Sequence, residues 1–313
     1  SASPFRNTEE ARVNATATAA LNFNGHTGLT TATVEEDGTA NVLTLQNVPA
    51  TANVFPALNF RGDNGTGANQ TFDSLIYNAV GNTGSSDSLA ITVGNRGTAI
   101  NSGTATTFSF AVGGAATQTP GFETISATCS DGPCTFSGLT ATTLVTLNVT
   151  GSSNVTLGTV DATASTVLAV NASNVTGNFS ATVDDVATGA NVTLGGGNDT
   201  FTIGAGSTGT STFNTLGAGN DTFTGDTNTA SADTISAGDG SDTVNGGLGI
   251  DTVTTGNGSD IVIYDIVPAA ANAKNVTDFT TGAGGDILRF DISALALASA
   301  GAEDSGVVGG LSV

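Results

Sequence analysis

Residues 238–262 read GDGSDTVNGGLGIDTVTTGNGSDIV, and this stretch decides the fold that the sequence predicts. Asp242, Asp251 and Asp260 stand nine residues apart, and each ends a Gly-x-Gly-x-Asp pattern. Each is followed by Thr or Ile and then by valine, which favours a short strand. Glycine permits the positive φ angles of a tight turn. A turn and a short strand in each nine-residue unit predict a coil of about eighteen residues with two corners.

The same pattern recurs on both sides of this stretch. Further copies end at Asp199, Asp221 and Asp286, and Asp233 stands nine residues before Asp242 in a copy that has lost its glycines. The spacings from Asp199 to Asp221 and from there to Asp242 are 22 and 21 residues, which predicts longer coils in that part. The expected turn and metal-ligating residues are Gly195, Gly197, Asp199, Gly217, Gly219, Asp221, Asp233, Gly238, Gly240, Asp242, Gly247, Gly249, Asp251, Gly256, Gly258, Asp260 and Asp286.

These residues predict calcium as the cofactor. Stacked corners would bring carboxylate and carbonyl oxygens to a common centre, and calcium takes six to eight such oxygens. Residues 195–291 hold twelve Asp, no Glu and two basic residues, a net charge of −10. Because stacked carboxylates repel without an ion, we expect this segment to fold only when cations neutralise it.

Upstream of the glycine motifs the chain has a looser period. From about residue 140, short β-branched runs are mostly ten to thirteen residues apart, and beyond Thr234 the spacing tightens to nine. Such a repeat predicts a parallel β-solenoid, whereas a β-sandwich, which also has strands every 8–12 residues, does not explain the tightening. The runs begin near Val145, Val155, Val167, Phe179, Val192, Phe201 and Phe213.

Whole-chain composition excludes several classes of protein. The 313 residues include 27 acidic and 6 basic side chains, for a formal charge of −21, so the basic stripe that nucleic acids require is missing. The apolar stretches 261–267 and 292–302 are shorter than the ~18 residues of a membrane-spanning helix. With one His, one Lys, no Trp, no Met and no nucleophile–base motif, we expect no enzymatic activity.

Two cysteines, Cys129 and Cys134, enclose the turn sequence Ser-Asp-Gly-Pro. A disulfide between them is the preferred interpretation, and two free buried thiols are the alternative. A disulfide favours an oxidising, extracellular location.

The glycine motifs resemble the RTX family, in which Gly-Gly-x-Gly-x-Asp-x-U-x nonapeptides form a calcium-filled parallel β-roll. Residues 246–254, GGLGIDTVT, match at every defined position. Residues 276–279 and 282–292 look like the module that closes RTX arrays in proteins exported by type I secretion. Residues 121–125, 148–156 and 169–178 look like the Thr/Ala/Asn-rich β region that precedes the repeats in RTX-type surface-layer (S-layer) proteins of bacteria.

The resemblance implies a secreted structural protein of the bacterial cell surface. Its calcium-stabilised solenoid would assemble with copies of itself into a surface layer or similar array, with cell-surface polysaccharide as a further partner. The alternative is the calcium-folding export or stabilising region of a larger secreted enzyme or adhesin. Neither interpretation involves nucleic acid or a membrane span.

We therefore predict an all-β chain, a parallel β-solenoid with a calcium β-roll, preceded by an irregular β region. Residues 1–120 lack the rhythm and form either a separate β domain or an irregular extension of the solenoid. A Thr/Asn-rich solenoid follows over 121–194, the calcium roll over 195–266 and a capping, secretion-associated module over 267–313. Short helices fit 8–15 and 292–302.

Overall fold

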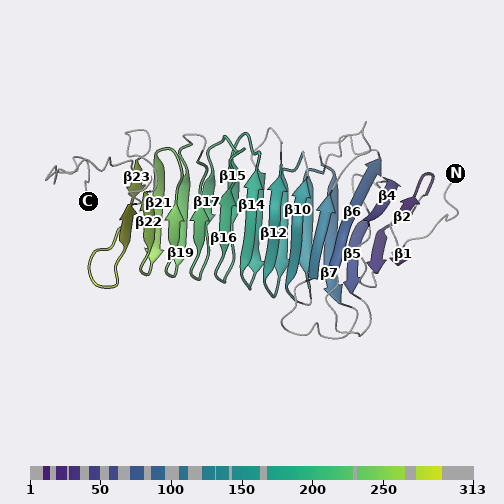
Figure 1. Cartoon of the computed structure of the whole chain (residues 1–313), viewed down its shortest axis with the longest axis horizontal. Helices are drawn as coiled ribbons and strands as arrows, with labels where there is room; N and C mark the ends of the chain where they lie inside the picture. Colours follow the sequence, from purple (N-terminus) through teal and green to yellow (C-terminus); the bar gives the residue numbers. More distant parts are fainter. Residues whose placement is uncertain are drawn as a thin grey trace, which may run out of the picture.

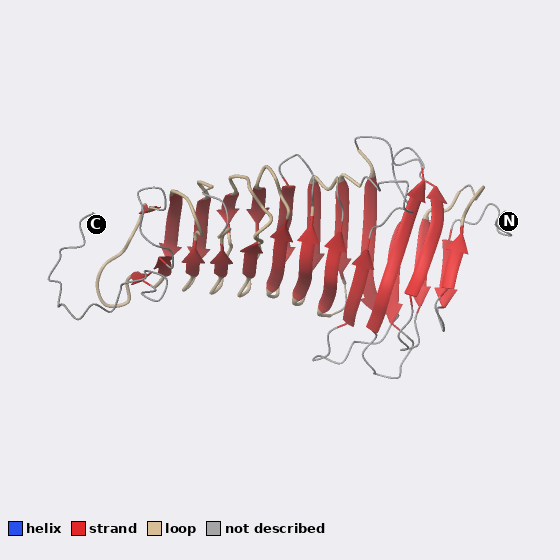
Figure 2. Ribbon diagram, turned by 45° about the horizontal axis from the view of Figure 1, so that its top comes forward, coloured by secondary structure: helices blue, strands red, loops and turns tan. Residues whose placement is uncertain are grey.

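The computed structural model is a β-solenoid whose coils follow one another along its long axis (Figures 1 and 2). It has two parallel 12-stranded sheets, one of odd-numbered and one of even-numbered strands, so each coil contributes one strand to each sheet. Among the described residues there is no helix, and thus none that could cross a membrane. The structure describes residues 10–14, 19–26, 28–35, 42–49, 56–62, 71–80, 86–95, 106–111, 122–130, 132–140, 143–162, 168–227, 231–264 and 273–290.

The odd-numbered sheet contains β1 (Glu10–Asn14), β3 (Thr31–Glu35), β5 (Ala57–Gly62), β7 (Ser88–Asn95), β9 (Thr124–Cys129), β11 (Thr146–Gly151), β13 (Leu168–Val175), β15 (Ala190–Thr193), β17 (Thr212–Thr215), β19 (Thr234–Asp239), β21 (Asp251–Asn257) and β23 (Lys274–Val276). The even-numbered sheet contains β2 (Ala19–Asn22), β4 (Val42–Pro49), β6 (Thr71–Val80), β8 (Thr106–Ala111), β10 (Cys134–Thr140), β12 (Val155–Asp161), β14 (Phe179–Asp184), β16 (Thr200–Ile203), β18 (Thr222–Thr224), β20 (Thr243–Asn245), β22 (Ile261–Tyr264) and β24 (Ile287–Phe290).

The core lies between the two sheets and is built from columns of residues in register. Phe201 of β16 pairs with Phe223 of β18, which pairs with Val244 of β20 and then Val262 of β22, and all four are fully buried. Burial alternates along β14, so every second side chain points inward, as the period of a strand requires. The larger of these side chains, Phe179 and Val183, each contribute about 1.5–3 kcal/mol by leaving water.

The rhythm predicted from about residue 140 is confirmed. Seven successive strands begin at residues 146, 155, 168, 179, 190, 200 and 212, each within two residues of a predicted start. All strand pairs in the two sheets are parallel, which excludes the β-sandwich.

The described part of residues 1–120 belongs to the same solenoid. Strands β1 to β8 continue the two sheets without a break, so this region is an irregular extension and not a separate β domain. The helix expected over 8–15 is wrong, because Glu10–Asn14 form β1 and pair in parallel with β3. Alternation of longer and shorter side chains there fits a pleated strand as well as a helical turn. The helix expected over 292–302 lies outside the described residues.

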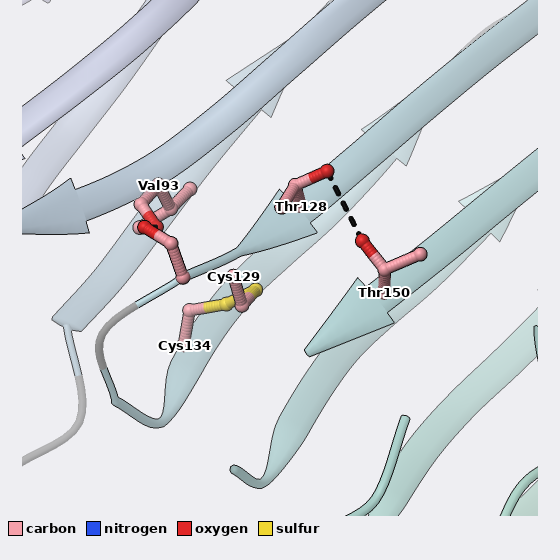
Figure 3. Close-up of a disulfide and its surroundings, with 6 residues drawn as sticks. Val93, Thr128, Cys129, Cys134 and Thr150 are labelled. Atoms are coloured by element: carbon pink, nitrogen blue, oxygen red, sulfur yellow. Dashed lines mark hydrogen bonds between the residues drawn. A yellow bond between two sulfur atoms is a disulfide. The ribbon is translucent and has the colours of Figure 1, made fainter. Parts of the chain in front are cut away.

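A disulfide joins the two sheets at one corner (Figure 3). Cys129 ends β9 and Cys134 begins β10, with a Cα–Cα distance of 6.2 Å, and both side chains are buried. On the neighbouring coil, the Thr150 hydroxyl donates to the Thr128 Oγ1 at 3.1 Å. The disulfide therefore closes a turn whose coil is covered by a neighbouring coil of the solenoid.

Candidate functional site

The motif residues lie at the two corners of the solenoid. We call the turn from an odd strand to the next even strand the first corner, and the turn from an even strand to the next odd strand the second corner. The nine-residue spacing places successive aspartates alternately at these corners. Asp242 and Asp260 immediately precede β20 and β22 at the first corner, whereas Asp233 and Asp251 stand at the starts of β19 and β21 at the second.

The first corner carries a column of aspartates, one per coil, which we call the first ladder. In each rung, Oδ1 accepts the backbone N–H of the ladder residue in the preceding coil: Asp199 donates to Asp221 at 2.7 Å, Asp221 to Asp242 at 2.7 Å, Asp242 to Asp260 at 2.8 Å and Asp260 to Asp286 at 3.1 Å. The rungs are 22, 21, 18 and 26 residues apart. The longer coils thus place extra residues elsewhere and keep each aspartate in the column.

The second carboxylate oxygens of this ladder are orphaned. Oδ2 of Asp199, Asp221, Asp242 and Asp260 is buried and has no hydrogen-bond partner among the described residues, and these four aspartates are at most 2% exposed. Burial raises the pKa of Asp199 to about 6, that of Asp221 to about 7 and that of Asp260 to about 6, against the opposing effect of the backbone N–H donors. Burial also raises the pKa of Asp242.

Adjacent rungs repel one another when both are ionised. Neighbouring strands are about 4.8 Å apart, and two unit charges at that distance repel by about 3–4 kcal/mol at an effective dielectric constant near 20. The fields of Asp199 and Asp242 contribute to the raised pKa of Asp221 between them. The column therefore needs either protons or bound cations.

The turns beside the ladder leave no room for side chains. Gly240 and Gly258 have φ angles of 142° and 141°, and a Cβ on either would lie 1.7 or 1.6 Å from the carbonyl oxygen of the glycine one coil earlier. The other glycines of the two stacked columns at this corner are Gly195, Gly217, Gly238 and Gly256 in one and Gly177, Gly197 and Gly219 in the other. Only glycine permits such close stacking of successive turns.

This donor set fits a hard divalent cation. Orphaned carboxylate oxygens beside closely stacked backbone carbonyls are the ligand type that calcium prefers. Among the described residues, no three His, Cys, Asp or Glu side chains gather at one point as a metal cluster. An ion held by neighbouring rungs would therefore take backbone or water oxygens as its remaining ligands.

Asp286 differs from the other four rungs. Its Oδ1 accepts from the Asp260 N–H, and its Oδ2 accepts from the Thr280 N–H at 2.7 Å and from the Thr255 hydroxyl at 3.2 Å. Asp286 therefore closes the C-terminal end of the ladder with protein donors, and it has less need of an ion than the sequence pattern indicates.

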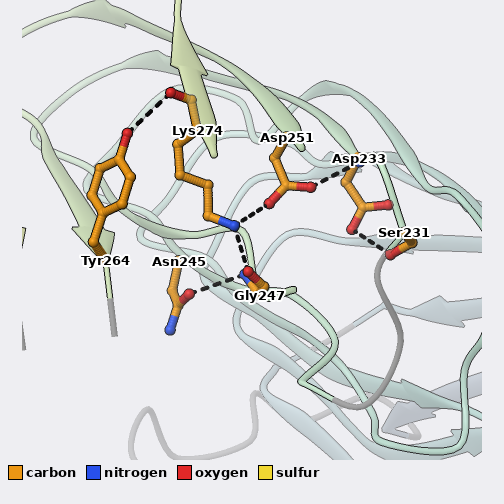
Figure 4. A network of polar contacts seen from close by, with 7 residues as sticks. All are labelled: Ser231, Asp233, Asn245, Gly247, Asp251, Tyr264 and Lys274. Carbon is orange, nitrogen blue, oxygen red and sulfur yellow. Dashed lines mark hydrogen bonds and ion pairs between the residues drawn. The ribbon is translucent and has the colours of Figure 1, made fainter. Parts of the chain in front are cut away.

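The second corner carries a shorter column, the second ladder, made of Ser211, Asp233 and Asp251. The Ser211 N–H donates to Asp233 Oδ1 at 2.7 Å, and the Asp233 N–H donates to Asp251 Oδ1 at 3.0 Å. Burial raises the pKa of Asp233 to about 6. This column ends on Lys274, whose Nζ lies 2.5 Å from Asp251 Oδ2 (Figure 4).

The glycines of the second corner pack as closely as those of the first. A Cβ on Gly249 would lie 1.6 Å from the Ser231 carbonyl oxygen. The Gly247 N–H donates to Asn245 Oδ1 at 3.0 Å, and its carbonyl accepts from the Lys274 ammonium. The pattern thus forms the same kind of turn at both corners.

An exposed column of asparagines beside the first ladder was not predicted. Each occupies the position before the ladder column, and its Oδ1 accepts the backbone N–H of the following coil. The pairs are Asn178 to Asn154, Asn198 to Asn178, Asn220 to Asn198 and Ser241 to Asn220, at 2.8–2.9 Å. These bonds run in the opposite direction to those of the aspartates, so the two columns fasten each coil to both neighbours. The available signal was the Asn or Ser directly before Asp199, Asp221 and Asp242.

No protein-family model, curated protein or solved structure matches the chain. A function therefore has to be inferred from the fold and from the chemistry of its corners. That chemistry is carboxylate, amide and carbonyl oxygen in repeated rows, which can bind cations.

Proposed function

We propose that this chain is an extracellular structural protein, a solenoid that calcium stabilises and that assembles with copies of itself into a surface layer or similar array. The observation that carries the proposal is the first ladder, with its row of buried, orphaned carboxylate oxygens. An unpaired buried carboxylate costs several kcal/mol, so a column of them indicates that a charge of opposite sign belongs there.

Calcium is the cation that the site favours. Asp199, Asp221, Asp242 and Asp260 at the first corner would each supply a carboxylate oxygen, and Asp233 would do so at the second. A divalent ion held between rungs replaces their mutual repulsion by attraction to a common charge. Magnesium demands a smaller, near-ideal octahedron and dehydrates reluctantly, so it should substitute poorly.

The assembly proposal follows from the shape and charge of the molecule. A solenoid has two ends, at which the backbone edges of its terminal strands lie open, and long sides on which similar outward-facing side chains and turns repeat from coil to coil. At a formal charge of −21 and with only six basic residues, two copies repel and have few intermolecular salt bridges available. Calcium ions between copies would supply the missing positive charge, and cell-surface polysaccharide would anchor the array.

The location follows from the same chemistry. Weak extracellular calcium sites operate at about 10⁻⁴–10⁻³ M, a concentration range that suits ion-dependent assembly outside the cell. The disulfide between Cys129 and Cys134 also fits an oxidising compartment.

The test is a calcium titration at fixed ionic strength, followed by circular dichroism, light scattering and electron microscopy. We expect β structure to form first and ordered arrays or filaments to follow, with magnesium and sodium much less effective. A calcium-folded protein that remains a monomer would instead support an export or stabilising region of a larger secreted protein. Assembly that depends on ionic strength alone would refute the calcium-bridge hypothesis.

A further inference from the structure

The only lysine of the chain is buried at the end of the second ladder (Figure 4). The Lys274 side chain is 3% exposed, and its Nζ contacts both Asp251 Oδ2, at 2.5 Å, and the Gly247 carbonyl oxygen. The Asp251 side chain is fully buried. These two oxygens belong to the same Gly-x-Gly-x-Asp copy, so the ammonium lies against a carbonyl and a carboxylate of one turn.

Lys274 occupies a rung position of the column. It pairs in register with Asp251, just as Asp251 follows Asp233 one coil earlier. The Tyr264 hydroxyl donates to the Lys274 carbonyl oxygen at 3.0 Å and helps to hold the backbone of β23.

The surroundings of the aspartate Oδ2 atom therefore differ between the two ladders. Oδ2 is orphaned on Asp199, Asp221, Asp242 and Asp260, whereas Oδ2 of Asp251 is met by an ammonium. Where the first ladder has a buried oxygen with no counter-charge, the second has a positive charge that the chain itself supplies.

We propose that the Lys274 ammonium is the resident cation of the second ladder. It takes the position of a metal ion between Asp251 and Gly247, and this one turn of the second corner consequently excludes calcium. Loss of the ammonium would convert these oxygens into one additional divalent-cation site. The identity of the ion rests on the proposed function, but the exclusion concerns any hard divalent cation.

The arrangement also makes the attachment of the last coil independent of calcium. The ion pair joins β21 to β23 directly, and a buried pair loses several kcal/mol when one partner is removed. Strand β23 can therefore dock on the second ladder before any ion binds.

The experiment compares the full wild-type chain with Lys274→Met, which removes the charge and keeps much of the side-chain volume. Arg289→Met is the matched control, because it removes one positive charge from an exposed side chain of β24, the next strand along the chain. The probe is terbium(III), an ion of calcium-like size and ligand preference that emits when a nearby tyrosine absorbs. Equilibrium dialysis measures bound ions per chain.

We expect Lys274→Met to bind one more ion per chain than the wild type, with a several-fold rise in tyrosine-sensitised emission. Arg289→Met should match the wild type in both measurements. Adding Tyr264→Phe to Lys274→Met should remove the additional emission and retain the additional ion, which locates the new site beside Tyr264. Equal ion numbers in folded Lys274→Met and wild type would overturn the proposal.

If Lys274→Met is unfolded in chelator, raising the calcium concentration should restore its β structure, because the ion takes over the role of the ammonium. Failure to recover at any calcium concentration would show a purely structural lysine and overturn the proposal. A second measurement uses the wild type: acylation of amines, followed by peptide mass analysis, should modify Lys274 at least tenfold more slowly in folded than in unfolded protein. The proposed function is tested by the calcium dependence of the wild type, whereas this proposal is tested by the difference between Lys274→Met and the wild type. Either can therefore fail without the other.

Discussion

Replacing Asp221 by asparagine should change the stability of the protein in opposite directions with and without calcium. Asparagine keeps a side-chain oxygen to accept the Asp199 N–H, which donates to Asp221 Oδ1 at 2.7 Å. It removes the negative charge and replaces the orphaned Oδ2 by an amide NH₂ group. Without calcium the repulsion is relieved, and with calcium a ligand is lost.

The structure sets the size of both effects. Asp221 lies between Asp199 and Asp242 in the ladder, and at the usual strand spacing of about 4.8 Å each neighbour that is ionised repels it by about 3–4 kcal/mol at an effective dielectric constant near 20. The new NH₂ group costs about 1–3 kcal/mol if it finds no acceptor. We therefore expect Asp221→Asn to be about 3–7 kcal/mol more stable than the wild type in chelator at pH 8, and about 2–3 kcal/mol less stable in saturating calcium.

The assay is urea unfolding followed by circular dichroism, in chelator and in 10 mM-range calcium (roughly tenfold above the weakest extracellular sites). Asp239→Asn is the matched control, because Asp239 is exposed and its Oδ1 accepts from the Asn257 side-chain amide at 2.7 Å. It should shift stability by less than about 0.5 kcal/mol in either condition. An Asp221→Asn variant that is less stable than the wild type in both conditions would refute the repulsion argument. It would indicate that the aspartates of the first ladder stabilise the fold through their hydrogen bonds alone.

Three further predictions concern the same fold. In chelator, the free energy of unfolding should rise as pH falls from about 7 towards 4, because burial raises the pKa of Asp221 from 3.8 to about 7 and the folded state then binds more protons than the unfolded state. Unfolding measured across this pH range with and without calcium tests the prediction, and stability that rises with pH in chelator would contradict it. Gly240→Ala should cost about 3 kcal/mol by thermal and urea unfolding, because its Cβ would collide with the preceding coil, whereas Gly196→Ala has open space and should cost less than about 1 kcal/mol. Native, unreduced protein should take up no thiol-alkylating reagent at Cys129 or Cys134, and replacing both by alanine should cost about 2 kcal/mol; two alkylated thiols by intact mass would contradict the bond.

The architecture could be predicted from sequence because a solenoid is a local fold. Each coil packs only on its neighbours, so the strand period and the nine-residue spacing of Asp242, Asp251 and Asp260 contain most of the information about the path of the chain. The first 120 residues were harder to interpret, since coil length there varies and the period is lost. The structure shows that loop length changes while strand register is kept, because β5 pairs without a register shift both with β3 and with β7, with paired residues 26 and 33 residues apart in the chain, respectively.

The contacts between coils were beyond the sequence pattern. The nine-residue period does not predict that Asp199 and Asp221, which are 22 residues apart, lie in one column with Asp242. Their register depends on the conformation of the longer loops between them. The contact of Lys274 with Asp251 spans 23 residues and places a lysine where the pattern leads one to expect an acid. Its partner is identified only when the strands are aligned.

Under the proposed function, the composition of the column at the first corner predicts the coil at which dependence on ions begins. Moving along the even strands, its occupants are Cys134, Val155 and Phe179, all buried, and then the aspartates from Asp199 onward. The apolar rungs are stabilised by burial and need no counter-charge. The Phe179 N–H donates to Asp199 Oδ1 at 2.7 Å, so the last apolar coil already holds the first acidic rung. Because coils interact mainly with their neighbours, folding on addition of calcium should proceed from this junction towards the C-terminus, each filled rung supporting the next.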